Sequence, residues 1–278
     1  MRSALARAGV DATTAVWNDP GVDWASFDLV LASGAWDNIH HVDAFLDWVD
    51  GVAASGVPVR NSPATLRWNI DKHYLQDLER ANVPTVATLW VEPGAGAGAV
   101  AALALPEGEV VVKPSVSGGG NRTARYQSHE HAAARAHITD LVATGRTAMV
   151  QPYEPRVDAE GERALVFIGG RFTHALHKEP MIRRGMGPQD NLIDNQVVTA
   201  ATATAAEQDL ASRALAAAED LLGPTSYARV DMVETVDRGP ALLELELLDP
   251  VLFLAQHPQG AAAAEALASE LARQLTDS

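Results

Sequence analysis

The chain has 278 residues, which is enough for two or three packed subdomains. Its 36 acidic and 21 basic residues give a formal net charge of −15, which excludes non-specific nucleic-acid binding because that needs a basic surface. Cysteine is absent, which excludes disulfides, thiolate metal sites and a thiol nucleophile. No apolar run approaches a membrane span and the N-terminus lacks a signal-peptide pattern, so we expect a cytoplasmic protein without a membrane partner.

The N-terminal residues predict a parallel α/β unit. Residues 2–10 predict a helix that ends near Gly9, residues 11–17 and 28–33 predict strands, residues 40–56 a helix and residues 57–61 a strand. Such a unit usually opens with a strand before its first helix. The first strand is therefore expected to be absent, or the natural chain to begin further upstream.

The pattern changes at Ser62, which is placed as the N-cap of a helix with Pro63 at its first position. Asp71 could cap a second helix before the stop at Pro84. Strands are then predicted over residues 85–91, 109–114 and 147–153, with a short helix after the glycine-rich turn that begins at residue 94 and a longer helix over residues 129–145.

The C-terminal part predicts two β-hairpins. Residues 163–178 turn at Gly169-Gly170, and residues 227–247 turn at Asp237-Arg238-Gly239. Helices are predicted over residues 205–222 and from Gly260 onward. The fold class expected from these elements is an α/β N-terminal domain followed by antiparallel-rich α+β structure.

A strand of β-branched residues leads Lys113 into the loop Ser115–Thr123, which contains Gly118, Gly119 and Gly120. Glycines allow backbone N–H groups to approach phosphate oxygens, and a lysine at the strand end adds a positive charge. The stretch matches neither the Walker pattern nor GxGxxG. It therefore indicates either a phosphate-binding loop or a mobile turn.

Carboxylates alternate with leucines in "LLELELLDP", where Glu244 and Glu246 share the face opposite Leu243 and Leu245. The partner strand "RVDMV" places Arg229 and Asp231 on one face. The hairpin can therefore bring Asp231, Glu244 and Glu246 together, and such a set suits Mg²⁺. The alternative is an ordinary half-exposed strand whose acids lie in water.

Together, Lys72 in a helix, "VVVKP" with the glycine-rich loop, "VQPY", "RVDMV" and "LLELELLDP" resemble the ATP-grasp superfamily. The sequence is most similar to the cyclo-ligases that close O-ureido-D-serine to D-cycloserine, and it also resembles RimK-type and glutathione synthetase-type ligases. The resemblance covers nearly the whole chain from Ala15. It implies a substrate domain over residues 1–68 and two α+β subdomains that enclose the nucleotide, a lid over residues 69–151 and a C-terminal subdomain over residues 152–278.

The resemblance also implies roles for individual residues. ATP would be held by two lysines, the glycine-rich loop, the hinge and one acid that binds the ribose. The lysines would be Lys72 and Lys113, and the ribose acid either Asp158 or Glu162. The loop and hinge residues would be Ser117, Gly118, Gly119, Gly120, Gln151, Pro152 and Tyr153. The metal acids would be Asp231, Glu244 and Glu246, although many relatives have Asn in place of Glu246. Catalytic contacts would come from Arg229, Lys178 and Arg183, and substrate contacts from Ser33, Trp36, Asp37 and Asn195.

Ser33 marks a departure, because the cyclo-ligase pattern has arginine three residues before the tryptophan of "WD". If that arginine grips the substrate, this chain is expected to prefer a different one.

The resemblance implies an ATP-dependent carboxylate–amine ligase that acts through an acyl phosphate and forms an amide or cyclic amide in natural-product (antibiotic) biosynthesis. Its cofactors would be ATP and one or two Mg²⁺, which Mn²⁺ could replace, and its partners would be small-molecule carboxylates and amines. A homodimer is compatible with the sequence. The alternatives are a nucleotide-binding regulatory protein without ligase activity, and a phosphotransferase that stops at a phosphorylated product.

Overall fold

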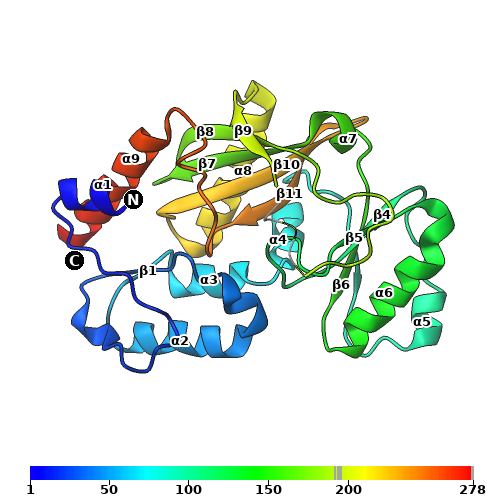
Figure 1. Ribbon diagram of the computed structural model, residues 1–278, viewed down its shortest axis with the longest axis horizontal. Coiled ribbons are helices and arrows are strands. Elements are labelled where there is room, and N and C mark those ends of the chain that lie inside the picture. The colour runs from blue at the N-terminus through cyan, green and yellow to red at the C-terminus, as the bar shows by residue number, and fades with distance from the viewer. Residues whose placement is uncertain (191, 193–195, 277–278) are drawn as a thin grey trace.

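The computed structural model of the protein describes residues 1–190, 192 and 196–276. Figure 1 shows two α+β layers side by side, with a smaller N-terminal layer packed below one of them. Both chain termini lie on the side away from helices α5 (Ala97–Ala101) and α6 (His131–Ala143) in Figure 1. Among the described residues, no helix is long and apolar enough to cross a membrane. These layers confirm the expected fold class of an α/β N-terminal region followed by α+β structure.

The N-terminal layer is built on two short parallel strands, in which Val30 pairs with Val59. Trp17 and Phe45 pack edge to face in its core, with their ring centroids 5.4 Å apart. The elements are β1 (Val30–Leu31), α2 (Val42–Ala54), β2 (Val59–Arg60), α3 (Pro63–Asn69) and the short 3-10 helices Trp24–Ser26 and Trp36–His40. As predicted, Ser62 caps α3, because its hydroxyl accepts a hydrogen bond from the Thr65 N–H at 3.1 Å.

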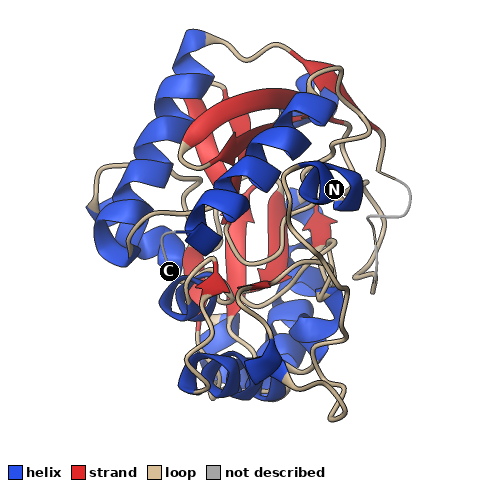
Figure 2. Cartoon of the chain, turned by 90° about the vertical axis from the view of Figure 1, so that its left-hand side faces the viewer, coloured by secondary structure: helices blue, strands red, loops and turns tan. Residues whose placement is uncertain are grey.

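Two N-terminal expectations need correction. Residues 11–17 form no strand, because they run along the surface without a ladder partner and only Trp17 is buried. The helix predicted over residues 2–10 exists as α1 (Arg2–Arg7), but it packs against the C-terminal helix α9 (Gly260–Thr276), where Arg7 forms an ion pair with Glu265. The two helices lie side by side in Figure 2, and α9 also contacts β2, because Arg60 Nε donates to Gln274 Oε1 at 2.6 Å.

The lid layer is a four-stranded antiparallel sheet in the order β3-β6-β4-β5, with α5 and α6 on its outer face (Figure 1). Its strands are β3 (Leu89–Val91), β4 (Val110–Pro114), β5 (Ala124–Tyr126) and β6 (Ala148–Pro152), and its helices are α5 (Ala97–Ala101) and α6 (His131–Ala143). α4 (Tyr74–Arg80) precedes this sheet, and Asp71 accepts a hydrogen bond from the His73 N–H at 3.0 Å before it begins. β5 was not predicted.

The C-terminal layer is a five-stranded antiparallel sheet in the order β11-β10-β7-β8-β9. Its elements are α7 (Val157–Glu160), β7 (Glu162–Ile168), β8 (Arg171–Lys178), β9 (Val198–Ala201), α8 (Ala205–Leu222), β10 (Tyr227–Thr235) and β11 (Gly239–Glu246). Both predicted hairpins and both predicted helices are present, whereas β9 was not predicted.

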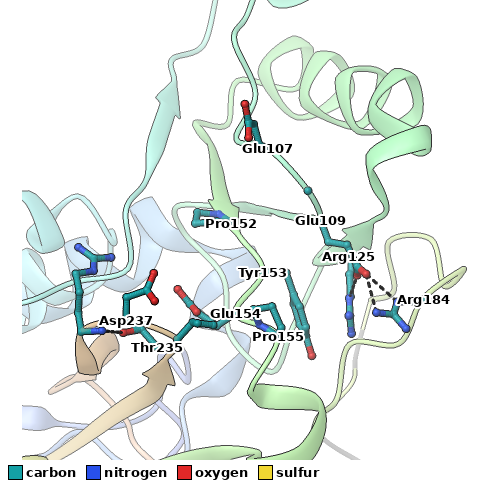
Figure 3. Close-up of a pocket in the computed structure, with 13 residues that line it drawn as sticks. Glu107, Glu109, Arg125, Pro152, Tyr153, Glu154, Pro155, Arg184, Thr235 and Asp237 are labelled. Carbon is teal, nitrogen blue, oxygen red and sulfur yellow. Dashed lines mark hydrogen bonds and ion pairs between the residues drawn. The ribbon is translucent and has the colours of Figure 1, made fainter.

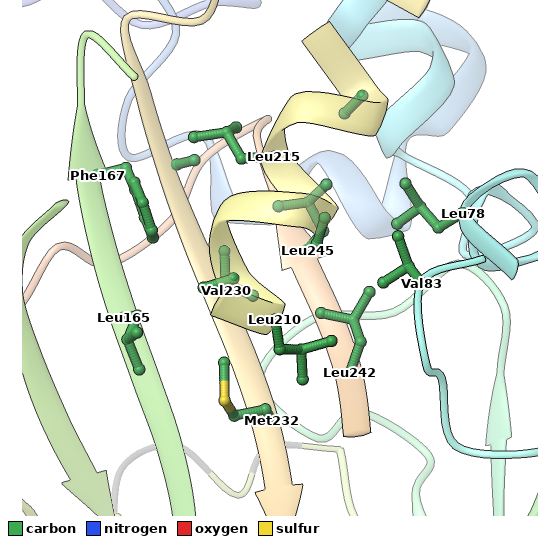
Figure 4. Close-up of a cluster of buried hydrophobic side chains, with 14 of the residues drawn as sticks. Leu78, Val83, Leu165, Phe167, Leu210, Leu215, Val230, Met232, Leu242 and Leu245 are labelled. Carbon is green, nitrogen blue, oxygen red and sulfur yellow. The ribbon is translucent and has the colours of Figure 1, made fainter. Parts of the chain in front are cut away.

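The two faces of this sheet differ along the strands. One face is mainly apolar and packs against α8 and α4, as Figure 4 shows for Leu165, Val230 and Leu245, although Arg163 of β7 pairs there with Glu207 of α8. The opposite face is apolar where α9 and α1 cover it, through Ala164 and Val166 of β7, and again at Val233 of β10, which packs near Val157 of α7. Beyond that cover the same face carries charged side chains, and these form the site described below.

Two asparagines dock the N-terminal layer on the end of this sheet. The Asn61 amide donates to the Leu247 carbonyl at 2.7 Å, and the Asn69 amide donates to the Leu245 carbonyl at 2.7 Å. In addition, the Tyr227 hydroxyl donates to the Ala32 carbonyl at 2.9 Å. Because buried amides with satisfied hydrogen bonds fix a relative orientation, the N-terminal layer is held against the charged sheet end.

Candidate active site

A cavity of about 470 Å³ lies where the three layers meet. Its walls are the charged face of the five-stranded sheet, strand β4 and the glycine-rich loop of the lid, and the 3-10 helix Trp36–His40 of the N-terminal layer. The sequence analysis placed candidate ligand-binding residues in all three layers, and some of them from each layer line this one cavity.

The predicted carboxylates lie on neighbouring strands. In the β10–β11 ladder Asp231 is opposite Glu244, and Arg229 is opposite Glu246. All four side chains line the cavity. The expectation that the hairpin brings Asp231, Glu244 and Glu246 onto one sheet face is therefore correct, and the alternative of unrelated surface acids does not hold.

Each of these acids is paired with a cation. Asp231 Oδ1 accepts from Arg229 Nε at 2.8 Å, and its Oδ2 accepts from Lys178 Nζ at 2.8 Å. Glu246 pairs with Arg229, and Glu244 Oε1 lies 3.0 Å from Lys72 Nζ. The acids are held apart by these partners, so no three acidic or histidine side chains in the described part of the chain form a ready-made metal site.

The surroundings shift the acid pKa values in opposite directions. Burial opposes ionisation of Asp231, but the Arg229 and Lys178 cations outweigh it and lower the pKa of Asp231 to about 2. Burial raises the pKa of Glu246, and repulsion from Glu244 and Asp231 adds to this effect although Arg229 opposes it. A divalent cation would relieve this repulsion, and Mg²⁺ needs only one or two protein carboxylates when phosphate and water fill its remaining positions. The donor set therefore fits Mg²⁺ bound together with a nucleotide.

The two predicted phosphate-binding lysines differ in their partners. Lys72 contacts the Ser117 carbonyl at 2.7 Å as well as Glu244. Lys113 is 8 % exposed, and no described carboxylate lies within ion-pair distance of its ammonium group. Burial lowers the pKa of Lys113 to about 8, although Glu244 partly opposes the shift. An unpaired buried ammonium that faces a cavity is suited to an anionic ligand.

The glycine-rich loop is joined to Gln189 and Leu192 of the C-terminal layer. The Arg122 N–H donates to the Gln189 carbonyl at 2.6 Å, and the Leu192 N–H donates to the Gly119 carbonyl at 2.9 Å. Gly120 has a φ of +73°, and a Cβ there would lie 2.8 Å from Leu192 Cδ1. Glycine is therefore required both by the backbone conformation and by the close approach of the second loop.

The predicted hinge leads from β6 into the C-terminal layer, and Gln151, Pro152 and Tyr153 all line the cavity. The Gln151 amide donates to Thr88 Oγ1 at 2.9 Å, so that side chain is already engaged. Tyr153 also borders a second cavity of about 340 Å³ on the outer side of the hinge, shown in Figure 3.

The structure separates the two candidate ribose-binding acids. Asp158 accepts two hydrogen bonds from Arg125 at 2.7 and 2.9 Å and one from the Tyr153 hydroxyl at 2.7 Å, and it does not line the cavity. Arg125 in turn stacks on the Tyr153 ring, as Figure 3 shows, with its guanidinium carbon 3.3 Å from the ring centroid. Glu162 lines the cavity and lies 3.0 Å from Lys178 Nζ.

Only some of the residues predicted to contact substrate line the cavity. Trp36 lines the cavity and is 62 % exposed. Asp37 accepts a hydrogen bond from Trp17 Nε1 at 2.8 Å, and neither Asp37 nor Ser33 lines the cavity. Arg183 lies on the exposed loop after β8 and does not line the cavity either, while Asn195 is outside the described residues.

Two cavity residues were missed by the sequence analysis. Asp249 follows β11, and Gln196 precedes β9, and both contribute side chains with an unpartnered buried polar atom among the described residues. The signal for Asp249 was present in the motif "LLELELLDP", where a third acid follows the two glutamates.

Comparison with known proteins agrees with this geometry. Residues 1–61 match the family described as the N-terminal domain of the D-cycloserine synthetase DcsG. The cycloserine biosynthesis protein DcsG of Streptomyces lavendulae is 34 % identical over 282 residues, which cover 98 % of this chain and 92 % of that protein.

Solved structures show the same relationship. The crystal structure of D-cycloserine synthetase DcsG superposes with a TM-score of 0.90 at 33 % identity, over 99 % of this chain and 93 % of that one. A RimK-domain ATP-grasp protein from Sphaerobacter thermophilus gives a TM-score of 0.61 at 21 % identity, over 98 % and 92 % of the two chains. D-alanine–D-alanine ligase from Bacillus anthracis complexed with ATP gives 0.57 at 15 % identity, over 90 % and 78 %.

Proposed function

The chain belongs to the D-cycloserine synthetase family of ATP-grasp ligases, and from this premise we propose that it closes a ring within one amino-acid substrate by joining its carboxylate to a nitrogen of the same molecule. As a member of this family it is an ATP-dependent ligase that forms carbon–nitrogen bonds in natural-product biosynthesis. The cyclising reaction and the residue roles below are our proposals.

One observation supports the proposed site more than any other. Lys113, which has no carboxylate within ion-pair distance among the described residues, faces the same cavity as the acids Asp231, Glu244 and Glu246. A polyphosphate could therefore lie between a free cation on the lid and a carboxylate set on the opposite sheet. Few other ligands need both.

In the proposed arrangement Lys72 and Lys113 bind phosphate oxygens, and the hinge backbone at residues 151–153 contacts adenine. We assign the ribose hydroxyls to Glu162 rather than Asp158, because Glu162 lines the cavity and Asp158 is occupied by Arg125 and Tyr153. Asp231, Glu244 and Glu246 would hold one or two Mg²⁺, or Mn²⁺ in its place. When bound, the metal neutralises phosphate charge and orients the phosphoryl group.

The reaction proceeds in two steps. A substrate carboxylate oxygen attacks the γ-phosphorus of ATP, ADP leaves, and an acyl phosphate forms. The substrate nitrogen then attacks the acyl carbon, the C–O bond to phosphate breaks, and the nitrogen loses a proton as the amide forms. Arg229 and Lys178 lie beside Asp231 and could stabilise charge on the transferred group and on the acyl oxygen.

The test is an assay of ADP release from Mg·ATP with O-ureido-D-serine, paired with mass spectrometry of the product. Substrate-dependent ADP release together with a cyclic amide is the expected result. ADP release with a phosphorylated product and no amide would instead identify a phosphotransferase. Nucleotide binding without any substrate-dependent ADP release across a panel of carboxylates and amines would indicate a regulatory protein.

A further inference from the structure

Asp249 contributes a carboxylate to the cavity that the metal and phosphate sites do not use. It lies after β11, between Leu248 and the N-terminal layer, and its Oδ1 accepts a hydrogen bond from the Gly34 N–H at 2.6 Å. Its Oδ2 is buried and has no hydrogen-bond partner in the part of the chain that the structure describes. Buried polar atoms are almost always satisfied, so this oxygen requires an explanation.

No cation among the described residues accounts for this carboxylate. Burial raises the pKa of Asp249 to about 6, and only the backbone N–H groups of Gly34 and Ala35 oppose the shift. An acid with a cationic neighbour would instead have a lowered pKa, as Asp231 does. Asp249 is therefore an acceptor that the described residues leave without a positive partner.

The cations of the cavity are engaged elsewhere. Lys72 pairs with Glu244, and Lys178 and Arg229 both pair with Asp231. Lys113 is on the lid, beside the glycine-rich loop, where the nucleotide phosphates are placed. A positive partner for Asp249 must therefore come from a ligand.

We propose that Asp249 binds the ammonium group of the amino-acid substrate and selects for it. The proposal rests on the proposed ligase function, since it places an amino-acid substrate in this cavity. Asp249 is at the end of the cavity formed with the N-terminal layer, where Trp36 and Asn38 also line the wall. This end is free for a substrate once the phosphates lie between Lys113 and the hairpin acids.

The unpartnered oxygen is closed off from water in this conformation, so a ligand reaches the carboxylate only after it turns about χ2. That torsion is broad in aspartate, and the Gly34 N–H can bond either oxygen. Asp249 thus has two separable properties, a negative charge and an acceptor for the Gly34 N–H. Asparagine retains the acceptor and removes the charge, whereas alanine removes both.

The first measurement is substrate binding by calorimetry in the presence of Mg·ADP, for O-ureido-D-serine and for its analogue without the α-amino group. The unaltered protein should bind the amino compound about 10- to 100-fold more tightly, as expected for a hydrogen bond between charged groups. Asp249→Asn should lose this preference by weakening only the amino compound. A matched control is Glu219→Gln, since Glu219 accepts from the Thr225 N–H at 3.0 Å and does not line the cavity; it should retain the preference.

The second measurement is kcat/KM for both compounds, together with the KM for ATP. Asp249→Asn should lower kcat/KM for the amino compound alone, with the KM for ATP unchanged. The proposal is overturned if Asp249→Asn lowers kcat/KM equally for both compounds. It is also overturned if Asp249→Asn leaves kcat/KM unchanged while Asp249→Ala lowers Tm, because Asp249 would then only hold the Gly34 loop in place. If the unaltered protein discriminates between the compounds in binding but releases no ADP with either, the proposed reaction fails while the ammonium site stands. If it binds both equally, the ammonium site fails regardless of turnover.

Discussion

Lys72 Nζ lies 3.0 Å from Glu244 Oε1, so a residue assigned to phosphate already holds a residue assigned to metal. The pair links the lid side of the cavity to the hairpin. Nucleotide binding must therefore exchange partners, because the ammonium turns to phosphate as the carboxylate turns to the cation that the nucleotide brings. Removing one partner of this ion pair should therefore affect both ligand binding and stability.

Removing the charge of either glutamate should separate activity from stability. Glu244→Gln and Glu246→Gln should each lower kcat by more than about 100-fold at saturating Mg²⁺, because both acids are placed as metal ligands. Glu244→Gln should also lower Tm, since it leaves the buried Lys72 ammonium without its partner. Glu246→Gln should change Tm less, because Arg229 retains its ion pair with Asp231. Glu265→Gln, on the surface, serves as the control, and wild-type rates in both cavity variants would contradict the metal assignment.

Lys113→Met should weaken nucleotide binding and stabilise the protein. At neutral pH the buried ammonium has no described carboxylate partner and its pKa is lowered to about 8, so the charge destabilises the folded state. Methionine removes that cost and should raise the free energy of unfolding by about 2 kcal/mol. Affinity for Mg·ADP should fall about tenfold or more. Calorimetry and urea unfolding measure the two effects, and unchanged nucleotide affinity would argue against a phosphate contact.

Gly120→Ala should separate the glycine-rich loop from Gln189 and Leu192. The new Cβ would lie 2.8 Å from Leu192 Cδ1, and the φ of +73° would cost alanine about 1–2 kcal/mol. Hydrogen exchange at Arg122 and Leu192, whose amides join the two loops, should accelerate. Gly118→Ala is the matched control for loop docking, because its Cβ meets only Ile39 Cγ2 at an ordinary 3.6 Å. Equal protection in both variants would show that the contact with Leu192 does not hold the loops together.

His137 should make stability depend on pH. Burial lowers the pKa of this histidine to about 4, and the nearby Arg122 guanidinium adds to the shift. The pKa of His137 in the folded state is below the unfolded value of about 6.5. The free energy of unfolding is therefore at its full value above pH 6.5 and falls as the pH drops towards 4. Urea unfolding should show that wild type loses on the order of 2 kcal/mol more than His137→Gln over this range. Parallel pH profiles for the two proteins would show that His137 does not titrate as described.

Ser33→Arg should alter substrate preference without altering ATP binding. Ser33 precedes Gly34, whose N–H bonds Asp249, and an arginine there would restore a carboxylate-binding fork near the substrate end of the cavity. The relative kcat/KM among candidate amino acids should shift while the KM for ATP stays constant. A change in ATP affinity with unchanged substrate preference would show that this loop is not the selector.

The sequence predicted most of the central and C-terminal elements because their patterns are strong. The hairpin of β10 and β11 alternates apolar and charged residues, so the register that places Asp231 opposite Glu244 follows from period-two spacing. The short edge strands β5 and β9 were missed, since a run of three or four residues such as "VTAA" is too short to show an alternating pattern. Residues 11–17 have the composition of a strand but lack a neighbour to pair with, which composition does not reveal.

Sequence motifs predicted the cavity residues that belong to those motifs. They did not predict residues whose role depends on contacts with distant parts of the chain. Lys72, Lys113 and the hairpin acids all line one cavity, in keeping with the resemblance. Asp37 could not be distinguished from a ligand-binding residue by sequence, because its partner Trp17 is remote in the chain. Asp158 and Glu162 were equivalent in sequence, and only the position of Arg125 on β5 separates them. The role of Asp249 could not be inferred from the sequence, because it depends on the contact with Gly34, which is remote in the chain.

The backbone hydrogen bonds that join Gly119 to Leu192 and Arg122 to Gln189 also bear on how fast the enzyme can work. Both loops line the cavity, so we expect product release to involve their separation. Loop opening is a microsecond-to-millisecond event in many enzymes and often limits turnover in place of chemistry. Raising the solvent viscosity slows loop motion but does not affect the chemical step, so it should lower kcat in this protein. In a variant with weaker hydrogen bonds between the two loops, kcat should not depend on viscosity.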